Sequence, residues 1–133
     1  MKNEGLNAIA TNDAPAAIGA YSQGIVVGRF VFTSGQLPID PATGDMPESV
    51  QDQTRLALAN LEAVLKAGGS SLDKVVKVTL FLSDIADFKD VNEVYKRVFE
   101  AAGGVFPARS AVQVAALPKP GAKLEIEAVS TAI

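Results

Sequence analysis

Phe106-Pro107-Ala108-Arg109-Ser110 and Lys123-Leu124-Glu125-Ile126-Glu127 are the two stretches on which the fold of this chain depends. Each predicts a strand, and residues 117–121, Leu-Pro-Lys-Pro-Gly, predict the turn that joins them. Each strand also carries a charge among apolar or small neighbours, an arginine at position 109 and a glutamate at position 125. The reason why these charges occupy segments that otherwise avoid water is the main question about function.

Six segments of the chain have the composition of strands. They span residues 6–10, which could form a short edge strand, 25–27, 30–33, 75–82, 109–115 and 122 onward, and the runs 25–27 and 30–33 are rich in β-branched and aromatic residues. Gly28-Arg29 separates two of them and predicts a hairpin with a two-residue turn. Within residues 75–82, the alternation predicts one fully buried face, formed by Val76, Val78, Leu80 and Leu82.

Two segments repeat apolar residues at helical spacing. The first begins after Ser49, a favourable N-cap, with Asp52 as a partner of the capping-box type, and it ends at Gly68-Gly69. Its predicted buried face consists of Val50, Thr54, Ala57, Leu58, Leu61, Val64 and Leu65. The second begins after Asp87 as its cap and ends at Gly103-Gly104. Its predicted buried face consists of Phe88, Val91, Val94, Tyr95, Val98 and Phe99.

The order of these elements predicts an α+β fold. Each helix separates two strands and can therefore form a crossover connection, which places both helices on one face of a single mixed six-stranded sheet. Nothing else in the chain is available to cover the other face. An apolar sheet face open to water favours association, so we expect other subunits to cover it.

Length and composition limit the function further. The 133 residues fit one domain spanning residues 1–133, and 48% of them are hydrophobic. A net charge of −3 without any basic run argues against nucleic acid as the main partner. The chain has no histidine and no cysteine, which excludes a histidine base, a Ser-His-Asp triad and thiolate or imidazole metal sites. No signal-like N-terminus or apolar run of about 20 residues occurs, so we expect a cytoplasmic protein.

Arg109 and Glu125 each allow two interpretations. Small residues flank Arg109, so its guanidinium has room to grip a carboxylate bidentately; the alternative is a structural ion pair with Glu125 or a helix C-terminus. Glu125 could orient or deprotonate a water molecule, or it could belong to a solvated strand face. Burial would raise the pKa of Glu125 and a nearby arginine would lower it.

Other candidate residues give weaker signals on their own. Ser34-Gly35 ends a strand at a sharp turn, where the glycine permits close approach and backbone amides can donate to an anion. Tyr21 and Asn92 are a loop tyrosine and a helix asparagine without a distinctive local pattern. Neither a dinucleotide fingerprint nor a phosphate loop is present, and no acidic spacing of the EF-hand type occurs. A site for a small anion that uses neither metal nor cofactor fits these exclusions.

Several motifs together resemble one family. They are Ala14-Pro15 through Tyr21-Ser22-Gln23, Phe32-Thr33-Ser34-Gly35-Gln36, Asp87-Phe88 through Tyr95, Phe106-Pro107-Ala108-Arg109-Ser110-Ala111-Val112 and Leu124-Glu125-Ile126. Nearly the whole chain is similar, in order, to the reactive intermediate deaminase family, RidA or YjgF. The resemblance implies a chorismate-mutase-like fold and a homotrimer in which three sheets form an inner barrel with sites between subunits.

The same resemblance implies an activity and its residues. Family members hydrolyse the reactive enamine and imine acids 2-aminoacrylate and 2-iminobutanoate to 2-oxo acids and ammonia, without a cofactor. The carboxylate-gripping arginine corresponds to Arg109 and the water-positioning glutamate to Glu125. The remaining substrate-binding positions correspond to Tyr21, Ser34, Gly35, Asn92 and Ala111, the last of which stands where many members have cysteine.

Two other functions remain open from the sequence. Ribonuclease or translation-inhibitor activity is also ascribed to some members of the family, although the acidic balance and missing histidine argue against it. The same arginine pocket would also serve a non-catalytic, regulatory binder of small carboxylates.

Overall fold

The computed structural model describes residues 5–132, which form one mixed sheet and two α-helices. The strands are β1 (Asn7–Ile9), β2 (Gly24–Val27), β3 (Phe30–Thr33), β4 (Val75–Leu82), β5 (Ala108–Gln113) and β6 (Leu124–Thr131). The helices are α1 (Val50–Ala67) and α2 (Phe88–Ala102). The six strands lie in the order β1-β2-β3-β6-β4-β5. The predicted α+β class is therefore confirmed.

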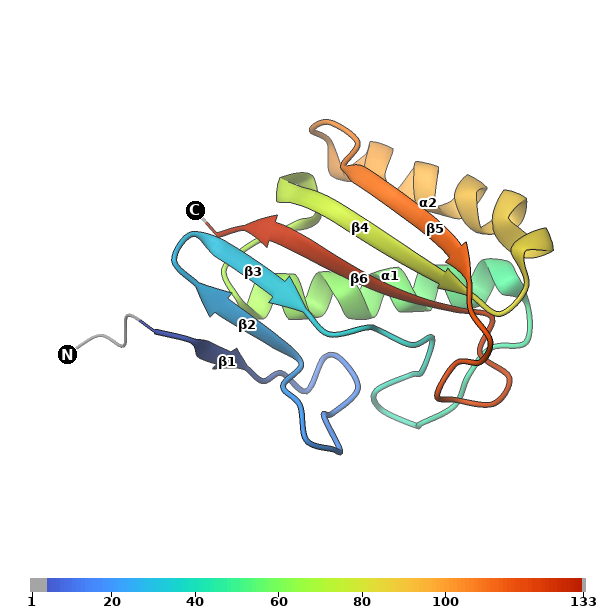
Figure 1. Cartoon of the computed structure of the whole chain (residues 1–133), viewed down its shortest axis with the longest axis horizontal. Helices are drawn as coiled ribbons and strands as arrows, with labels where there is room; N and C mark the ends of the chain where they lie inside the picture. Colours follow the sequence, from blue (N-terminus) through green and yellow to red (C-terminus); the bar gives the residue numbers. More distant parts are fainter. Residues whose placement is uncertain (1–4, 133) are drawn as a thin grey trace.

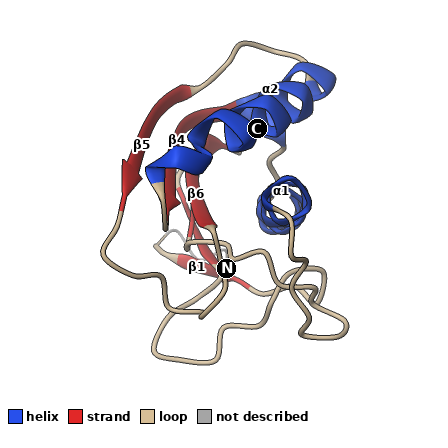
Figure 2. Ribbon diagram, turned by 90° about the vertical axis from the view of Figure 1, so that its right-hand side faces the viewer, coloured by secondary structure: helices blue, strands red, loops and turns tan. Residues whose placement is uncertain are grey.

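The two helices make the two crossovers that the element order predicts. β4 and β5 are parallel neighbours joined through α2, whereas α1 connects β3 to β4 across β6, which pairs antiparallel with both. Both helices lie on the same side of the curved sheet (Figures 1 and 2). The core fills the space between this side of the sheet and the helices; its largest fully buried side chains include Leu58, Leu61, Leu65, Leu80, Leu82, Leu124 and Ile126.

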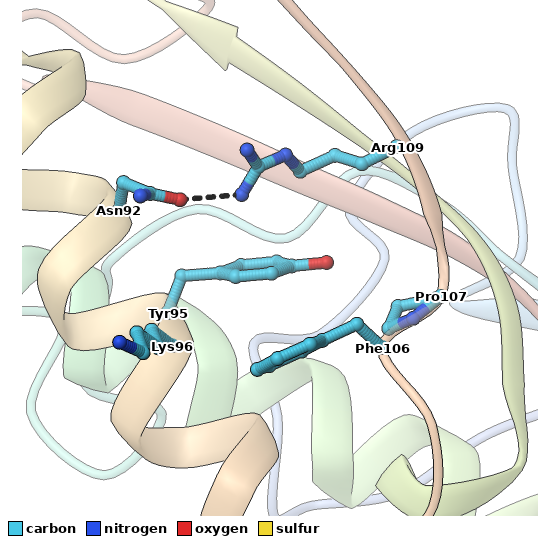
Figure 3. A pocket seen from close by; sticks show the side chains of 6 residues that line it. All are labelled: Asn92, Tyr95, Lys96, Phe106, Pro107 and Arg109. Atoms are coloured by element: carbon cyan, nitrogen blue, oxygen red, sulfur yellow. Dashed lines mark hydrogen bonds between the residues drawn. The ribbon is translucent and has the colours of Figure 1, made fainter.

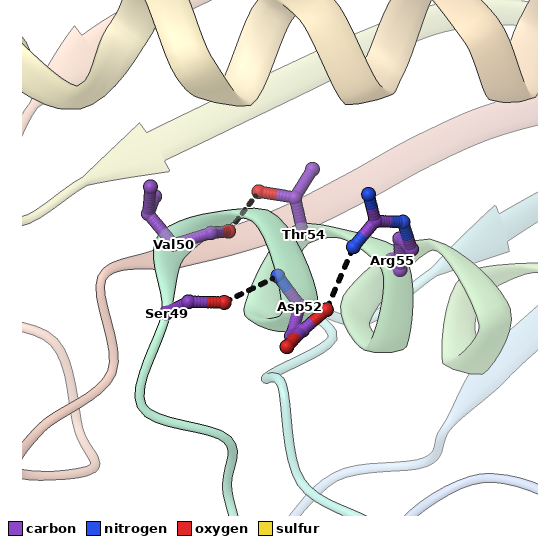
Figure 4. A network of polar contacts seen from close by, with 5 residues as sticks. All are labelled: Ser49, Val50, Asp52, Thr54 and Arg55. Atoms are coloured by element: carbon purple, nitrogen blue, oxygen red, sulfur yellow. Dashed lines mark hydrogen bonds and ion pairs between the residues drawn. The ribbon is translucent and has the colours of Figure 1, made fainter.

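α1 forms much as predicted. All seven residues of its predicted apolar face are buried, and the Ser49 hydroxyl accepts a hydrogen bond from the Asp52 amide at 3.1 Å (Figure 4). The Asp52 carboxylate does not reach back to the cap, because it pairs with Arg55 at 2.7 Å. The capping-box prediction is therefore correct for Ser49 and wrong for Asp52.

The start of α2 differs from its prediction. Asp87 makes no side-chain capping bond. Instead, a short 3-10 turn, Ile85–Asp87, precedes the helix, and the Asp84 carboxylate accepts from the Ala86 amide at 2.9 Å. The cap lies three residues earlier because the 3-10 turn satisfies the first amides before the helix begins. The predicted apolar face packs on the core, with Phe88 and Val98 only partly buried.

β4 contains a β-bulge near its start, which the alternation of apolar residues in the sequence does not reveal. Val75 pairs with Ser130 and Lys77 with Val129, so Val76 is an extra residue in this strand. Such a bulge reverses the alternation locally. Val76 is therefore 46% exposed and Val75 is buried, which contradicts the predicted burial of Val76. Beyond the bulge, Val78, Leu80 and Leu82 are buried as predicted.

The sheet face opposite the helices is open. Phe30 and Phe32 are each 45% exposed, and they alternate along β3 with residues that are buried toward the helices. Val112 on β5 is 44% exposed. No described segment covers this face (Figure 2). Among the described helices, none has the length and apolar character that a membrane span requires.

Candidate active site

Arg109 lies on the helix side of the sheet. It is the second residue of β5, the edge strand, and it pairs with Val78, which is fully buried under the helices. Residues paired across two strands share a face, so the Arg109 side chain also points toward the helices. Because β5 is at the edge, the guanidinium reaches α2 without entering the core.

One side of α2 holds the Arg109 guanidinium. Its Nη1 donates to Asn92 Oδ1 at 2.6 Å, and its Cζ lies 4.8 Å from the Tyr95 ring centroid and 5.2 Å from that of Phe88. Phe88, Asn92 and Tyr95 are spaced four and three residues apart, so they face the same way along the helix. Figure 3 shows the Arg109 side chain extending from its strand toward Asn92 on this helix, with the Tyr95 ring below the guanidinium.

A cavity of about 350 Å³ adjoins the arginine. Its lining residues are Asn92, Tyr95, Lys96, Phe106, Pro107 and Arg109. None of them is acidic, and the ion pairs within residues 5–132 are Arg55–Asp52 and Lys66–Glu62. The alternative of a structural ion pair for Arg109 is therefore wrong within the described chain. The cation is held by an amide and two rings, and no carboxylate of residues 5–132 forms an ion pair with it.

Tyr95 is the buried member of this group. It is 3% exposed, and its hydroxyl has no hydrogen-bond partner within the described chain. Burial raises the pKa of Tyr95, and the Arg109 guanidinium opposes that rise through its positive charge and through its N–H groups near the hydroxyl oxygen. The hydroxyl therefore stays protonated at neutral pH and is available as a donor.

Glu125 lies on the other face of the sheet. Burial alternates along β6, with Leu124 and Ile126 buried toward the helices and Glu125 between them directed away. It borders an open cavity of about 800 Å³, whose lining includes Tyr21, Ser34, Gly35, Lys119, Glu125 and Glu127. Three of the predicted substrate-binding residues, Tyr21, Ser34 and Gly35, therefore gather beside Glu125.

Gly35 and Ser34 shape this second cavity in different ways. A Cβ atom on Gly35 would lie 2.6 Å from Glu125 Cδ, so the absence of a side chain gives the carboxyl its place. The Ser34 amide donates to Gln23 O at 2.9 Å and its hydroxyl to Ser22 O at 2.5 Å. These bonds fix the turn. Because the Ser34 amide already donates to Gln23 O, it is not free to donate to an anion, although the sequence had suggested that role.

The pKa of Glu125 is raised above its ordinary value of 4.5. Burial is the larger cause, and repulsion from Glu127 on the same side of the strand adds to it. Of the two opposing effects considered from the sequence, burial prevails, because Arg109 is on the opposite face of the sheet. A raised pKa makes the carboxylate a stronger base.

The predicted site residues thus form two groups that one chain does not bring together. Arg109 and Asn92 belong to the cavity beside α2, whereas Tyr21, Ser34, Gly35 and Glu125 belong to the cavity on the open sheet face. Ala111 lines neither cavity, and its side chain packs against the core. Its contribution to binding stays a prediction.

Sequence reasoning missed several residues of the two cavities. Tyr95, which lines the cavity of Arg109, was assigned only to the core, and so was Phe88, whose ring lies beside the Arg109 guanidinium; their spacing from Asn92 places all three on one helix face. Glu127 and Lys119 line the cavity of Glu125. The separation of Glu127 from Glu125 by one residue in a strand is the signal that could have identified it.

Comparisons with known proteins agree on one family. The profile of the family described as "Endoribonuclease L-PSP" matches residues 11–132. A 2-iminobutanoate/2-iminopropanoate deaminase from Salmonella typhimurium is 48% identical over 122 residues, covering 92% of this chain and 94% of the relative. Its counterpart of the same name from Escherichia coli K12 is 47% identical with the same coverage.

Solved structures are similar over almost the same length. The crystal structure of Escherichia coli TdcF with bound serine has a TM-score of 0.91 and 50% identity, covering 94% of this chain and 98% of that one. The YjgF gene product of Escherichia coli also gives a TM-score of 0.91, at 46% identity with the same coverage.

Proposed function

Because this chain belongs to the endoribonuclease L-PSP family, we propose that it hydrolyses the reactive enamine and imine acids 2-aminoacrylate and 2-iminobutanoate to 2-oxo acids and ammonia. The observation that carries the proposal is the Arg109 guanidinium, which borders a cavity and has no acidic partner in the described chain. Such a fork matches the carboxylate shared by these substrates. Two relatives close to half identical over most of the chain carry the name of this activity.

The chemistry needs few groups, because an imine carbon is already electrophilic. The enamine 2-aminoacrylate becomes such an imine when a proton leaves its nitrogen and another joins its β-carbon, as the C=C π electrons form that C–H bond and the C=N bond forms. The water oxygen bonds to that carbon while the C=N π electrons move to nitrogen, and Glu125 carries a proton from the water to the nitrogen. In the second step, Glu125 takes the remaining hydroxyl proton and protonates the nitrogen again. The C–N bond then breaks as the C=O bond forms, and ammonia leaves. The raised pKa of Glu125 suits a group that both accepts and returns a proton. No step of this reaction calls on a cofactor.

The complete site, in this proposal, forms between subunits of a homotrimer. Arg109 and Asn92 of one copy face Tyr21, Ser34, Gly35 and Glu125 of the next. Two observations support this arrangement. The two groups lie on opposite faces of the sheet in one chain, and the sheet face that carries Glu125 exposes Phe30 and Phe32, which association would bury.

Mixing two inactive variants tests both the residues and the arrangement. We expect Arg109→Ala and Glu125→Gln each to lose at least tenfold in release of 2-oxobutanoate from freshly generated 2-iminobutanoate, since each removes a charged hydrogen bond. When the two are unfolded together and reassembled, about a quarter of the interfaces of a random trimer combine the intact residues, so activity should return in part.

Each possible result has a definite meaning. Wild-type activity in Arg109→Ala contradicts the assignment of the anchor, and mixtures as inactive as the separate variants contradict a shared site. Cleavage of RNA by the same preparation, without keto-acid release, would favour the endoribonuclease in the family's name. Binding of 2-oxobutanoate without either activity would favour a regulatory carboxylate binder.

A further inference from the structure

The cavity beside α2 is lined by hydrogen-bond donors. Arg109 and Lys96 bring two positive charges to it, Tyr95 brings a hydroxyl, and no carboxylate from the part of the chain that the structure describes is among its lining residues. The amide oxygen of Asn92 is one acceptor that side chains bring to this lining, and it already accepts from Arg109 Nη1 at 2.6 Å. A ligand that satisfies these donors must therefore be an anion with several acceptor oxygens.

The contacts of Arg109 decide which of its donors are available. Asn92 occupies Nη1, and the rings of Phe88 and Tyr95 lie within cation–π distance of the guanidinium. The edge formed by Nε and Nη2 makes no side-chain hydrogen bond or ion pair in the described chain. This edge is the one that grips a carboxylate with two parallel hydrogen bonds.

The hydroxyl of Tyr95 is the second uncommitted donor. The residue is 97% buried, and its hydroxyl lacks a partner, although buried polar atoms are nearly always hydrogen-bonded in native proteins. Its ring lies under Arg109, with the hydroxyl end toward Pro107, within the same cavity (Figure 3). An acceptor that enters the cavity to meet Arg109 is in position to meet this hydroxyl too.

We infer that Tyr95 is a further substrate-binding residue, whose hydroxyl donates to the carboxylate that Arg109 holds. Its ring supports the guanidinium from below, and its hydroxyl adds one hydrogen bond to the same anion. The inference rests on the proposed function for the identity of that anion, a small 2-oxo or 2-imino acid. It predicts that Tyr95 affects the binding of the carboxylate and hardly affects its conversion.

Tyr95→Phe tests this inference, because it removes the hydroxyl and retains the ring. We expect the dissociation constant for 2-oxobutanoate, measured by titration without turnover, to rise at least tenfold, and KM for 2-iminobutanoate to rise in parallel with kcat changed by less than about threefold. Ser71→Ala, which deletes a hydroxyl outside both cavities, should bind as the wild type does. Affinity within twofold of wild type in Tyr95→Phe overturns the inference.

Two further measurements keep the result interpretable. In the intact protein with ζ-¹³C-labelled tyrosine, the Tyr95 signal should move when 2-oxobutanoate is added; a signal that stays unchanged at saturation also overturns the inference. The chain has two tyrosines, so Tyr21→Phe assigns the signals. The dissociation constant and the tyrosine signal both report binding and need no turnover. If the protein binds 2-oxobutanoate but does not release it from the imine, that result contradicts the proposed function alone, and these two measurements still test the role of Tyr95.

Discussion

Gly35 lies so close to the Glu125 carboxyl that adding one methyl group there should impair activity without impairing folding. The added Cβ of Gly35→Ala would lie 2.6 Å from Glu125 Cδ and 2.8 Å from its Oε2, while the backbone at this glycine is compatible with alanine. The flexible glutamate side chain can move away, so we expect nearly unchanged thermal stability and at least a tenfold loss of deaminase activity. Thermal unfolding and keto-acid release, measured together, check this prediction. A cooperative loss of both would show that Gly35 serves folding.

Glu125 should also set the acid side of the pH profile. Its pKa is raised, by burial first and by Glu127 second, so activity that needs the carboxylate should rise with pH above about 4.5. Glu127→Gln removes the repulsion, and the acid limb of kcat/KM should then move to lower pH. An unmoved limb would mean that another group controls it.

The same shift has a consequence for stability. A carboxyl whose pKa is higher in the folded state than in the unfolded state binds its proton more tightly when folded. Its contribution to stability is therefore present at low pH and is lost as pH rises through the folded pKa. Glu125→Gln should accordingly be more stable than wild type at neutral pH, and the two should converge as pH falls below about 4.5, which denaturant titrations at several pH values will measure.

At the scale of elements, Gln53 ties α1 to the loop before β6. Its amide nitrogen donates to Pro47 O at 2.9 Å and Gly121 O at 3.0 Å, and its amide oxygen accepts from the Lys123 amide at 2.7 Å. The side chain is 1% exposed. These bonds fix the segment that carries Lys119 beside the cavity of Glu125.

Gln53→Leu should therefore destabilise the protein by about 1–3 kcal/mol, because it leaves buried backbone groups without partners. Urea unfolding measures the change. Gln51→Leu, a partly exposed position on the same helix, is the matched control and should change stability by less than about 0.5 kcal/mol. Equal effects of both variants would contradict the structural role of the Gln53 bonds.

The sequence predicted the helices and strands well, but it did not predict the bulge and the helix cap that interrupt their regular pattern. The apolar faces of both helices and the Gly28-Arg29 hairpin follow from local periodicity and turn chemistry. The bulge at Val76 and the cap at Asp84 escaped prediction, because each depends on how the segment meets a neighbour. Gln53 escaped for the same reason: its partners lie up to 70 residues away.

At the scale of the whole molecule, the open sheet face should drive assembly. Phe32→Asp places a charge among exposed apolar side chains, where association would have to bury it without a partner. We expect this variant to sediment as a monomer and to lose deaminase activity while its helical circular dichroism persists. Ile85→Asp, at a residue that is 49% exposed and belongs to the short 3-10 turn before α2 and not to the sheet, should assemble normally. A Phe32→Asp protein that remains a trimer would contradict the predicted interface.

The amino-acid sequence by itself determined the two helices, the six strands, the absence of histidine and cysteine, and the charged candidates Arg109 and Glu125. Only the tertiary structure decided that these two residues lie on opposite faces of the sheet, with Tyr95 beneath one and Gly35 against the other. The physical reason is that side chains alternate along a strand, so a shift of one residue in pairing moves a charge to the other face. Local periodicity specifies the element, whereas the face toward which its charges point is settled by long-range pairing.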